Sequence, residues 1–342
     1  MIDPSRIDSC RRQRGAALLT AMIIVALVAT LAGSMVWQQW RAIQVEAAER
    51  ARTQSAWILS GALDWARLIL REDAKDDAAH PPPKDHLGEP WAVPLAEARL
   101  STFLAADKDN TEDAPDAFLS GVITDAMARY NLMNLLEATG GGIDPRELAS
   151  LERLCETIGV SKDIATRIAT GLRDAAPPAP PTPGASAPPY VPPADPPLMP
   201  QSASQLAWLG IDAESLRALN PYVILIPDTL RLPATARVNV NTAPREVLVA
   251  VVDKLDLATA ERIVQSRQRA PLKGIGDLTA LAPSVPPDNL NRLAFSSNYF
   301  QVRGRLRLGD VVLEQRSLVK RNGQTVVVLQ RERVSAREQT GS

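Results

Sequence analysis

The chain has few of the residues that build disulfide networks and metal centres. Its 342 residues include 2 Cys and 2 His, and aromatic residues make up 4%. Cys155 follows Leu151 and Leu154 at helical spacing, so we expect a small buried side chain there and no disulfide. His80 and His86 have no Cys or closely spaced carboxylates beside them in metal-ligand spacing, so we expect solvated loop residues.

The sequence also lacks the motifs of the common catalytic sites and the charge of a nucleic-acid binder. It contains no Gly-x-Ser-x-Gly elbow, no Cys-His pair, no His-Glu-x-x-His and no phosphate loop. The formal net charge is −1, whereas a nucleic-acid-binding surface is basic. These absences favour a non-enzymatic protein.

One long apolar run is present near the N-terminus. Residues 16–37 contain no charged side chain, and a helix of about 20 apolar residues spans a bilayer. The short segment before the run is basic, which predicts a cytoplasmic N-terminus and a single crossing. Its arginines are Arg6, Arg11, Arg12 and Arg14.

The position of the small residue distinguishes this run from a secretory signal peptide. A signal peptide carries its small-residue cleavage site after the apolar segment. Here Gly15 precedes the apolar segment, so a cut between Gly15 and Ala16 would remove the basic leader and keep the helix.

This arrangement resembles the type IV pilin and pseudopilin signal, in which prepilin peptidase cuts after Gly and the new N-terminus is methylated. The resemblance implies cleavage between Gly15 and Ala16 and N-methylation of Ala16. Pilin-like subunits generally carry Glu as the fifth mature residue, but the fifth residue here is Thr20. That absence is typical of minor pseudopilin K of the type II secretion system. An ordinary single-pass anchor that follows an Arg-Gly pair is the alternative.

The remaining periodicity predicts an α+β chain. We expect one helix over residues 16–71, a loop over 73–94, a strand over 117–125 and one helix over 145–173 capped by Asp144. Residues 177–200 are rich in Pro and read as an extended linker. Further expected elements are a helical region over 202–219, short strands over 223–226 and 237–240, a helix begun by the Thr242 cap with Pro244 in its first turn and running to Val252, and a helix over 257–269.

The C-terminal region changes to the period of a strand. Residues 300–308 alternate apolar and basic side chains, and Asn322-Gly323 is a strong hairpin signal. We expect a three-stranded antiparallel sheet whose arginine row faces solvent, although such a row could also bind anions.

The order of these parts is similar to the minor pseudopilin K family along the whole chain. The matching pieces are Gly15-Ala16-Ala17-Leu18-Leu19, Trp65-Ala66-Arg67, Gly121-Val122-Ile123-Thr124-Asp125, Arg129-Tyr130-Asn131-Leu132, Asn239-Val240-Asn241-Thr242-Ala243-Pro244, residues 262–267 and residues 271–278. The resemblance implies a pilin-like fold, a long N-terminal helix on a small antiparallel sheet, interrupted by a large all-helical domain like SAM and helix-hairpin-helix modules.

We divide the chain on this basis. The expected parts are a leader (1–15), a transmembrane half-helix (16–37), a periplasmic half-helix (38–73), the first part of the pilin-like module (74–130), an inserted helical domain (131–285) with its Pro-rich linker (177–200), the C-terminal sheet (286–334) and a polar tail (335–342).

The resemblance further implies a subunit that initiates or caps a pseudopilus at its tip and supports export of folded proteins. It would lie in the inner membrane with its bulk in the periplasm, be processed by prepilin peptidase, and assemble with minor pseudopilins I and J and further pseudopilus subunits. The residues expected to pack in membrane and fibre are Leu18, Leu19, Ile23, Ile24, Leu27 and Leu31; Asn239, Asn241, Thr242 and Pro244 form a structural helix motif.

Some relatives bind calcium through an acid-rich loop, but the corresponding region here has Asp174 and, after it, Asp195. Because calcium takes six to eight oxygen ligands, we expect no metal or other cofactor.

Two other functions remain open at this point. A minor pilin of a type IV pilus would share the fold, and the helical insertion favours the secretion system. A membrane-anchored helix-hairpin-helix DNA-binding protein is a weaker alternative, because the loop after the first helix of the pair carries Asp253 and Asp256 where phosphate binding needs glycine amides and positive charge.

Overall fold

The computed structural model describes residues 5–99, 117–181, 184, 190–230, 236–308 and 311–337, with the side chains of 5–15, 311 and 334–337 left undescribed. The chain divides into two compact units, residues 1–58 and 59–342. Helix α1 (Ser5–Ala79) supplies the whole described part of the first unit and the beginning of the second.

Helix α1 is longer than the sequence predicted. We expected an end near Arg71, but the helix continues to Ala79, where His80 and three consecutive prolines follow. Proline lacks the N–H that a helix needs and disfavours helical backbone in the residue before it, so the prolines set the end.

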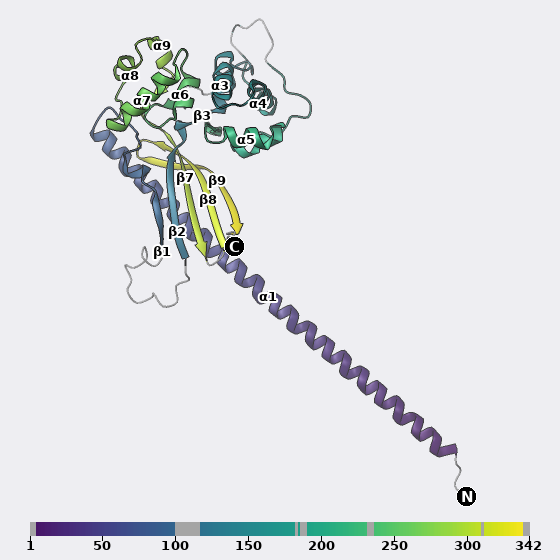
Figure 1. Ribbon diagram of the computed structural model, residues 1–342. Coiled ribbons are helices and arrows are strands. Elements are labelled where there is room, and N and C mark those ends of the chain that lie inside the picture. The colour runs from purple at the N-terminus through teal and green to yellow at the C-terminus, as the bar shows by residue number, and fades with distance from the viewer. Residues whose placement is uncertain are drawn as a thin grey trace. The chain divides into compact units, whose positions relative to one another are not determined.

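The second unit contains a five-stranded antiparallel sheet in the order β1-β2-β7-β8-β9 (Figure 1). The expected three C-terminal strands are therefore part of a larger sheet, because β2 pairs with β7 and the unpredicted strand β1 pairs with β2. The strands are β1 (Leu95–Arg99), β2 (Ala117–Asp125), β7 (Tyr299–Leu308), β8 (Val311–Asn322) and β9 (Thr325–Arg337).

The end of α1 packs on one face of this sheet. Leu63, Ala66 and Leu70, spaced by three and four residues, lie on one side of the helix and are buried against Phe300 and Val302. The ring of Trp91, in the short 3-10 helix η1 (Pro90–Ala92), meets the ring of Phe300 edge-on at 5.2 Å. This packing gives the long helix on a small sheet that the resemblance implied.

The chain leaves the sheet at the end of β2 and returns at the start of β7. Between these points lie the 3-10 helices η2 (Ala126–Ala128), η3 (Leu132–Leu135), η4 (Ala203–Leu209) and η5 (Pro227–Thr229), and the α-helices α3 (Pro145–Thr157), α4 (Lys162–Ala175), α5 (Ala213–Leu219), α6 (Arg245–Val251), α7 (Leu257–Arg269), α8 (Ile275–Leu281) and α9 (Pro287–Leu290). Two short parallel pairs join them, β3 (Tyr130–Asn131) with β4 (Val223–Ile224) and β5 (Val238–Asn239) with β6 (Leu293–Ala294). We call this region the helical insertion.

The observed boundaries of the helices agree only in part with those predicted from the sequence. The Asp144 carboxylate accepts hydrogen bonds from the backbone N–H groups of Arg146 and Glu147, which confirms the predicted cap. The single helix expected over 145–173 is wrong: α3 and α4 are separated at Gly159, whose φ of +76° an L-residue rarely adopts. The predicted helix 257–269 is confirmed as α7.

Within the described part of the Pro-rich segment, Tyr190 is held by contacts to the rest of the helical insertion that we did not expect of an extended linker. Tyr190 donates a 2.5 Å hydrogen bond to Asp174, and the guanidinium of Arg173 lies 4.3 Å from the centre of the Tyr190 ring. The backbone N–H of Tyr190 also donates to the carbonyl of Gly140 at 2.7 Å. Residues 182–183 and 185–189 lie outside the described part of the chain.

Candidate functional site

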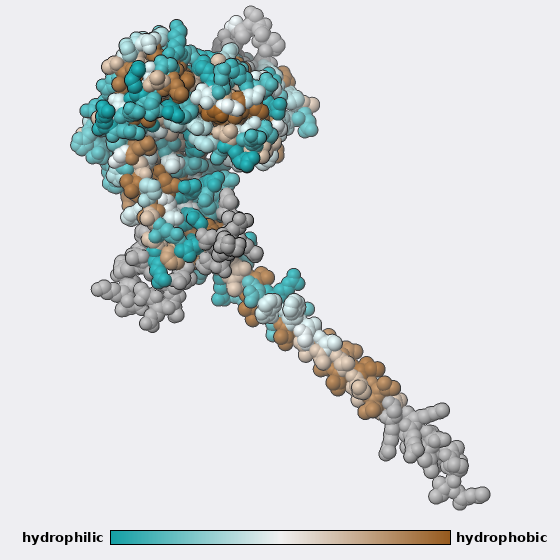
Figure 2. Space-filling model, in the orientation of Figure 1, coloured by the Kyte–Doolittle hydropathy of each residue, from teal (hydrophilic) through white to brown (hydrophobic). Residues whose placement is uncertain are grey.

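The apolar half of α1 is the first candidate site. Within the described residues, one helix is long and apolar enough to cross a membrane, and its most apolar stretch has a mean hydropathy of 2.4 with none of it buried in the protein. Figure 2 shows this stretch as a brown surface. The six residues predicted to pack in membrane and fibre are all exposed: Leu18, Leu19, Ile23, Ile24, Leu27 and Leu31.

Thr20 satisfies its own hydroxyl inside the helix. Its Oγ1 donates to the carbonyl of Ala16 at 2.8 Å and lies 3.1 Å from that of Ala17. A polar group that is satisfied within its helix costs little in lipid, whereas an ionised carboxylate at the same place would need a partner. Gly15 and Ala16 are consecutive within α1, and Ala16 is exposed.

The second candidate site is a buried polar junction between the sheet and the helical insertion. Asn239 is fully buried, and its side-chain amide donates to Asp125 Oδ2 at 3.0 Å and to Ser297 Oγ at 2.9 Å. The same amide donates to the backbone carbonyl of Asp85 at 3.0 Å. One residue of the insertion therefore contacts the end of β2, the loop after α1 and the segment that leads into β7.

Asp125 is the acceptor at the centre of the junction. Its Oδ2 accepts from the hydroxyls of Thr242 at 2.5 Å and Ser297 at 2.6 Å, and its Oδ1 accepts from the N–H of Met127 at 2.7 Å. Thr242 therefore does not cap a helix as we expected: Pro244 occupies the cap position of α6, and the threonine hydroxyl reaches back to the sheet. The demand of a buried carboxylate for donors accounts for the difference.

Asn241 forms hydrogen bonds within the helical insertion. Its amide donates to the carbonyl of Leu272 at 3.0 Å, and its side-chain oxygen accepts from the N–H of Leu272 at 2.9 Å. Within the Asn-Val-Asn-Thr motif, Asn239 and Thr242 therefore bond to Asp125 of the sheet, and Asn241 bonds to Leu272 in the segment between α7 and α8.

An ion-pair cluster continues the junction toward α1. Arg321, near the end of β8, donates to both oxygens of Asp85 at 2.6 and 2.7 Å and to Asp73 at 2.5 Å. The side chain of Arg321 is 6% exposed and that of Asp85 is fully buried. The ring of Phe300 lies 4.8 Å from the guanidinium, which adds a cation–π contact.

Two factors set the charges of this cluster: the burial of its side chains, and the excess of carboxylates over guanidinium groups. Burial raises the pKa of Asp85 to about 8 and the pKa of Glu89 to about 7. Burial opposes the charge of Arg321, but Asp85 and Asp73 hold its pKa above the ordinary value. Since one guanidinium serves two carboxylates, the cluster keeps Arg321 charged and resists ionisation of all its acids together.

Three carboxylates of the cluster could also be considered as metal ligands. Ligand atoms of Asp73, Asp85 and Glu89 lie within 4.8 Å of one another. Arg321 already brings positive charge to two of the three, and Glu89 accepts from the Trp91 indole N–H at 2.5 Å. A cation would have to displace the guanidinium, so these residues fit a structural ion pair better than a metal site.

The sequence indicated only part of the junction. Asn239 and Thr242 were singled out by their motif, and Asp125 was included as the last residue of a matching strand segment, but Asp85, Ser297 and Arg321 were not. Each of these three is ordinary in its local context, and their common role depends on which strands and loops the fold brings together.

Comparisons with known proteins agree on one family. Two models described as type II secretion system (T2SS), protein K match residues 128–228 and 238–300. Type II secretion system protein K of Pectobacterium carotovorum subsp. carotovorum is 29% identical over 94% of this chain and 96% of its own length. The Pseudomonas aeruginosa protein K is 28% identical, with 88% of this chain and 86% of the relative covered. That of Klebsiella pneumoniae is 29% identical.

A solved structure shares the fold. The crystal structure of the GspK-GspI-GspJ complex from enterotoxigenic Escherichia coli contains a chain similar to this one, with a TM-score of 0.59 and 22% identity. The match covers 84% of this chain and 99% of that chain. This likeness supports the pilin-like fold with a helical insertion.

Proposed function

We propose that this chain begins or caps a pseudopilus at its tip. The chain belongs to the protein K family of the type II secretion system, and it is thus a minor pseudopilin rather than an enzyme. The observation that carries the proposal is the retained apolar helix without an acid at its fifth mature position. Thr20 offers no carboxylate to the N-terminal amine of another subunit, and its hydroxyl is already bonded to the carbonyl of Ala16. Such a subunit has no acidic contact for a neighbour above it, so growth on that side stops.

The same helix defines the location. An apolar helix that is long enough to span a bilayer fits a single-pass membrane anchor. We place its N-terminus in the cytoplasm and residues 38–342 in the periplasm, since the arginines precede the apolar run. Prepilin peptidase would cut between Gly15 and Ala16, and Ala16 would then be methylated.

The partners follow from the family. The complex of the similar Escherichia coli chain contains GspI and GspJ. We propose that minor pseudopilins I and J bind this chain as well, with the exposed side chains of Leu18, Ile23 and Leu27 packed beside their helices first in the membrane and then in the fibre. The alternatives of a type IV minor pilin and a DNA-binding protein are not favoured by the family matches.

The test is the N-terminus of the mature protein. The full chain is purified from membranes of its own host and its N-terminal peptide is measured by mass spectrometry; we expect it to begin at Ala16 and to carry one methyl group. Gly15→Ala should leave the leader attached and abolish secretion. Gly33→Ala is the matched control, because a Cβ there meets no neighbour, and it should be processed and secrete normally. Secretion that continues with uncut protein would refute the proposal.

A further inference from the structure

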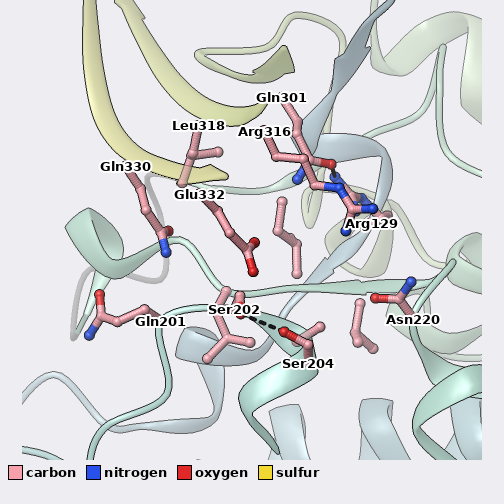
Figure 3. Close-up of a pocket in the computed structure, with 14 residues that line it drawn as sticks. Arg129, Gln201, Ser202, Ser204, Asn220, Gln301, Arg316, Leu318, Gln330 and Glu332 are labelled. Atoms are coloured by element: carbon pink, nitrogen blue, oxygen red, sulfur yellow. Dashed lines mark hydrogen bonds between the residues drawn. The ribbon is translucent and has the colours of Figure 1, made fainter. Parts of the chain in front are cut away.

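Figure 3 shows a small polar cleft against the sheet. Gln301, which lines the cleft, lies between Phe300 and Val302 on β7, and these two pack against α1, so the cleft is on the other face of the sheet. It has a volume of about 80 Å³ and is bounded by β7, β8 and β9 on one side and by the helical insertion on the other. The residues that matter to its chemistry are Arg129, Ser202, Ser204, Gln301, Arg316 and Glu332.

Arg129 is a half-buried cation that forms no salt bridge in this cleft. Its Nη2 donates to the neutral side-chain oxygen of Gln301 at 3.0 Å, and Arg129 makes no salt bridge with any residue that the structure describes. Burial lowers the pKa of Arg129, although Asp125 partly opposes the effect. Arg321, a buried arginine of the sheet, is instead held by two carboxylates. Arg129 is therefore electrostatically under-compensated, and a carboxylate beside it would supply what it lacks.

A second arginine and a pair of hydroxyl groups complete the cleft. Arg316 lies on β8, bonded to Glu314 through Nε at 2.6 Å. On the opposite wall, the hydroxyls of Ser202 and Ser204 are hydrogen-bonded to each other at 2.9 Å, which leaves one O–H of the pair to donate to an incoming oxygen (Figure 3). In the same figure Glu332 extends from the sheet toward these serines.

The mixed charge of the cleft selects the ligand. A space of about 80 Å³ has room for a carboxylate group. Glu332 disfavours a multiply charged anion, while its carboxylate can accept hydrogen bonds from the N–H groups of a peptide backbone. We propose that the cleft binds the side-chain carboxylate of an acidic residue presented by an adjacent protein subunit, with Arg129 and Arg316 as the cations that recognise it.

This inference deepens the proposed function and rests on it for the identity of the partner as another subunit of the same assembly. It adds that contact is made by the sheet and the insertion together, since Gln301 and Arg316 belong to the sheet and Arg129, Ser202 and Ser204 to the insertion. The contact would be additional to the helix packing in the membrane.

Site-directed photo-crosslinking tests the proposal in cells that secrete through this chain. A photoreactive phenylalanine at Ser204, in the full-length chain, should crosslink to a peptide of another subunit that contains Asp or Glu, identified by mass spectrometry. The double substitution Arg129→Gln and Arg316→Gln should lower the yield by about tenfold or more, because a charged hydrogen bond is lost at each site. Arg303→Gln is the matched control: Arg303 lies opposite Arg316 in the β7–β8 register, is exposed and lines no part of the cleft, so the yield should stay unchanged.

A charge swap distinguishes the carboxylate from general proximity. Arg316→Glu should abolish the crosslink, and replacing the identified acid of the partner by Arg should restore it. The proposal is overturned if no crosslink forms, if the crosslink reaches a peptide without an acid, or if the Gln substitutions leave its yield unchanged. It is also overturned if glutarate or inorganic phosphate raises the Tm of the purified full chain while no acidic peptide crosslinks, because the ligand would then be a free anion. Failure of the proposed function would look different, since deletion of the chain would then leave secretion intact.

Discussion

Both carboxylate oxygens of Asp85 accept hydrogen bonds from one nitrogen of Arg321, at 2.7 and 2.6 Å. Asp85 lies in the loop after α1, and Arg321 lies beside the turn that joins β8 to β9. The same guanidinium reaches Asp73 within α1. This ion pair therefore joins the last turns of the long helix to the sheet at a place where both charges are removed from water.

Removing the cation of this pair should be costly. At pH 9, above the pKa of about 8 of Asp85, Arg321→Met keeps much of the side-chain volume but leaves Asp73 and Asp85 buried without their counter-charge, which we expect to lower the free energy of unfolding by about 3–5 kcal/mol. Urea denaturation of the full chain in detergent measures it. Arg331→Met on β9 is the control, since Arg331 is exposed, and should change stability by less than about 0.5 kcal/mol. Equal stability of the two variants would contradict the role of the ion pair.

The raised pKa of Asp85 predicts a pH dependence. Its folded-state pKa of about 8 lies above the unfolded value of about 3.9, so the folded state binds the proton more tightly. The resulting stabilisation is present at low pH and is lost as pH rises through 8. We expect Asp85 to contribute about 1 kcal/mol to the difference in unfolding free energy between pH 7 and pH 9.

Asp85→Asn should remove that contribution, giving a smaller gain in stability on going from pH 9 to pH 7. Asp76→Asn, on the exposed side of α1, should keep the pH dependence of the unmodified chain. Denaturation curves at both pH values measure the difference. An Asp85→Asn variant with the original pH dependence would show that another group titrates.

The Thr242 hydroxyl should hold the helical insertion on the sheet. Thr242→Val keeps the shape but removes the donor 2.5 Å from Asp125, which should cost about 1–3 kcal/mol and raise hydrogen exchange in β5 and α6. Thr279→Val is the control, because that hydroxyl bonds only to carbonyls of its own helix among the described residues. Exchange that rises equally in both variants would argue against the junction.

The missing acid can be restored. Thr20→Glu should supply a carboxylate that pairs with the N-terminal amine of a neighbouring subunit. The chain should then be found along the pseudopilus and in higher copy. Thr20→Gln tests size without charge and should stay at the tip. Immunogold labelling of over-produced pseudopili locates both variants. Unchanged placement of Thr20→Glu would remove the support that the missing carboxylate gives to the tip assignment.

Counting thiols reports on processing. Cys155 is buried, and burial raises the pKa of its thiol to about 11, so the native chain should react slowly with a thiol reagent. After denaturation, the mature chain should show one reactive thiol, because cleavage after Gly15 removes Cys10. The Gly15→Ala variant should show two. Two thiols in the mature chain would mean that the leader is retained.

The elements that could be predicted are those whose signal is local. The alternation over 300–308 gave β7, and Asn322-Gly323 gave the β8–β9 hairpin, where Gly323 has a φ of +55°. Helix α7 is bounded by Asp256, whose carboxylate accepts from Thr259, and its apolar spacing is regular. In each case neighbouring residues decide the structure.

The elements that could not be predicted depend on contacts between distant residues. Strand β1 is short and largely exposed, and it forms because β2 offers its edge. Thr242 has every local feature of a helix cap, but its hydroxyl bonds to Asp125, which lies 117 residues earlier in the chain. The cleft at Arg129 needed the positions of β8, β9 and the insertion together.

The insertion starts and finishes at adjacent points of the sheet. Asp125, the last residue of β2, lies directly opposite Phe300 at the beginning of β7. A segment whose ends lie side by side can lengthen, shorten or be exchanged with only a small change in loop-closure entropy, because that cost grows slowly with length. The pilin-like sheet can therefore carry helical insertions of different size in different secretion systems. Each insertion must supply hydrogen-bond donors to the carboxylate of Asp125, where the insertion leaves the sheet.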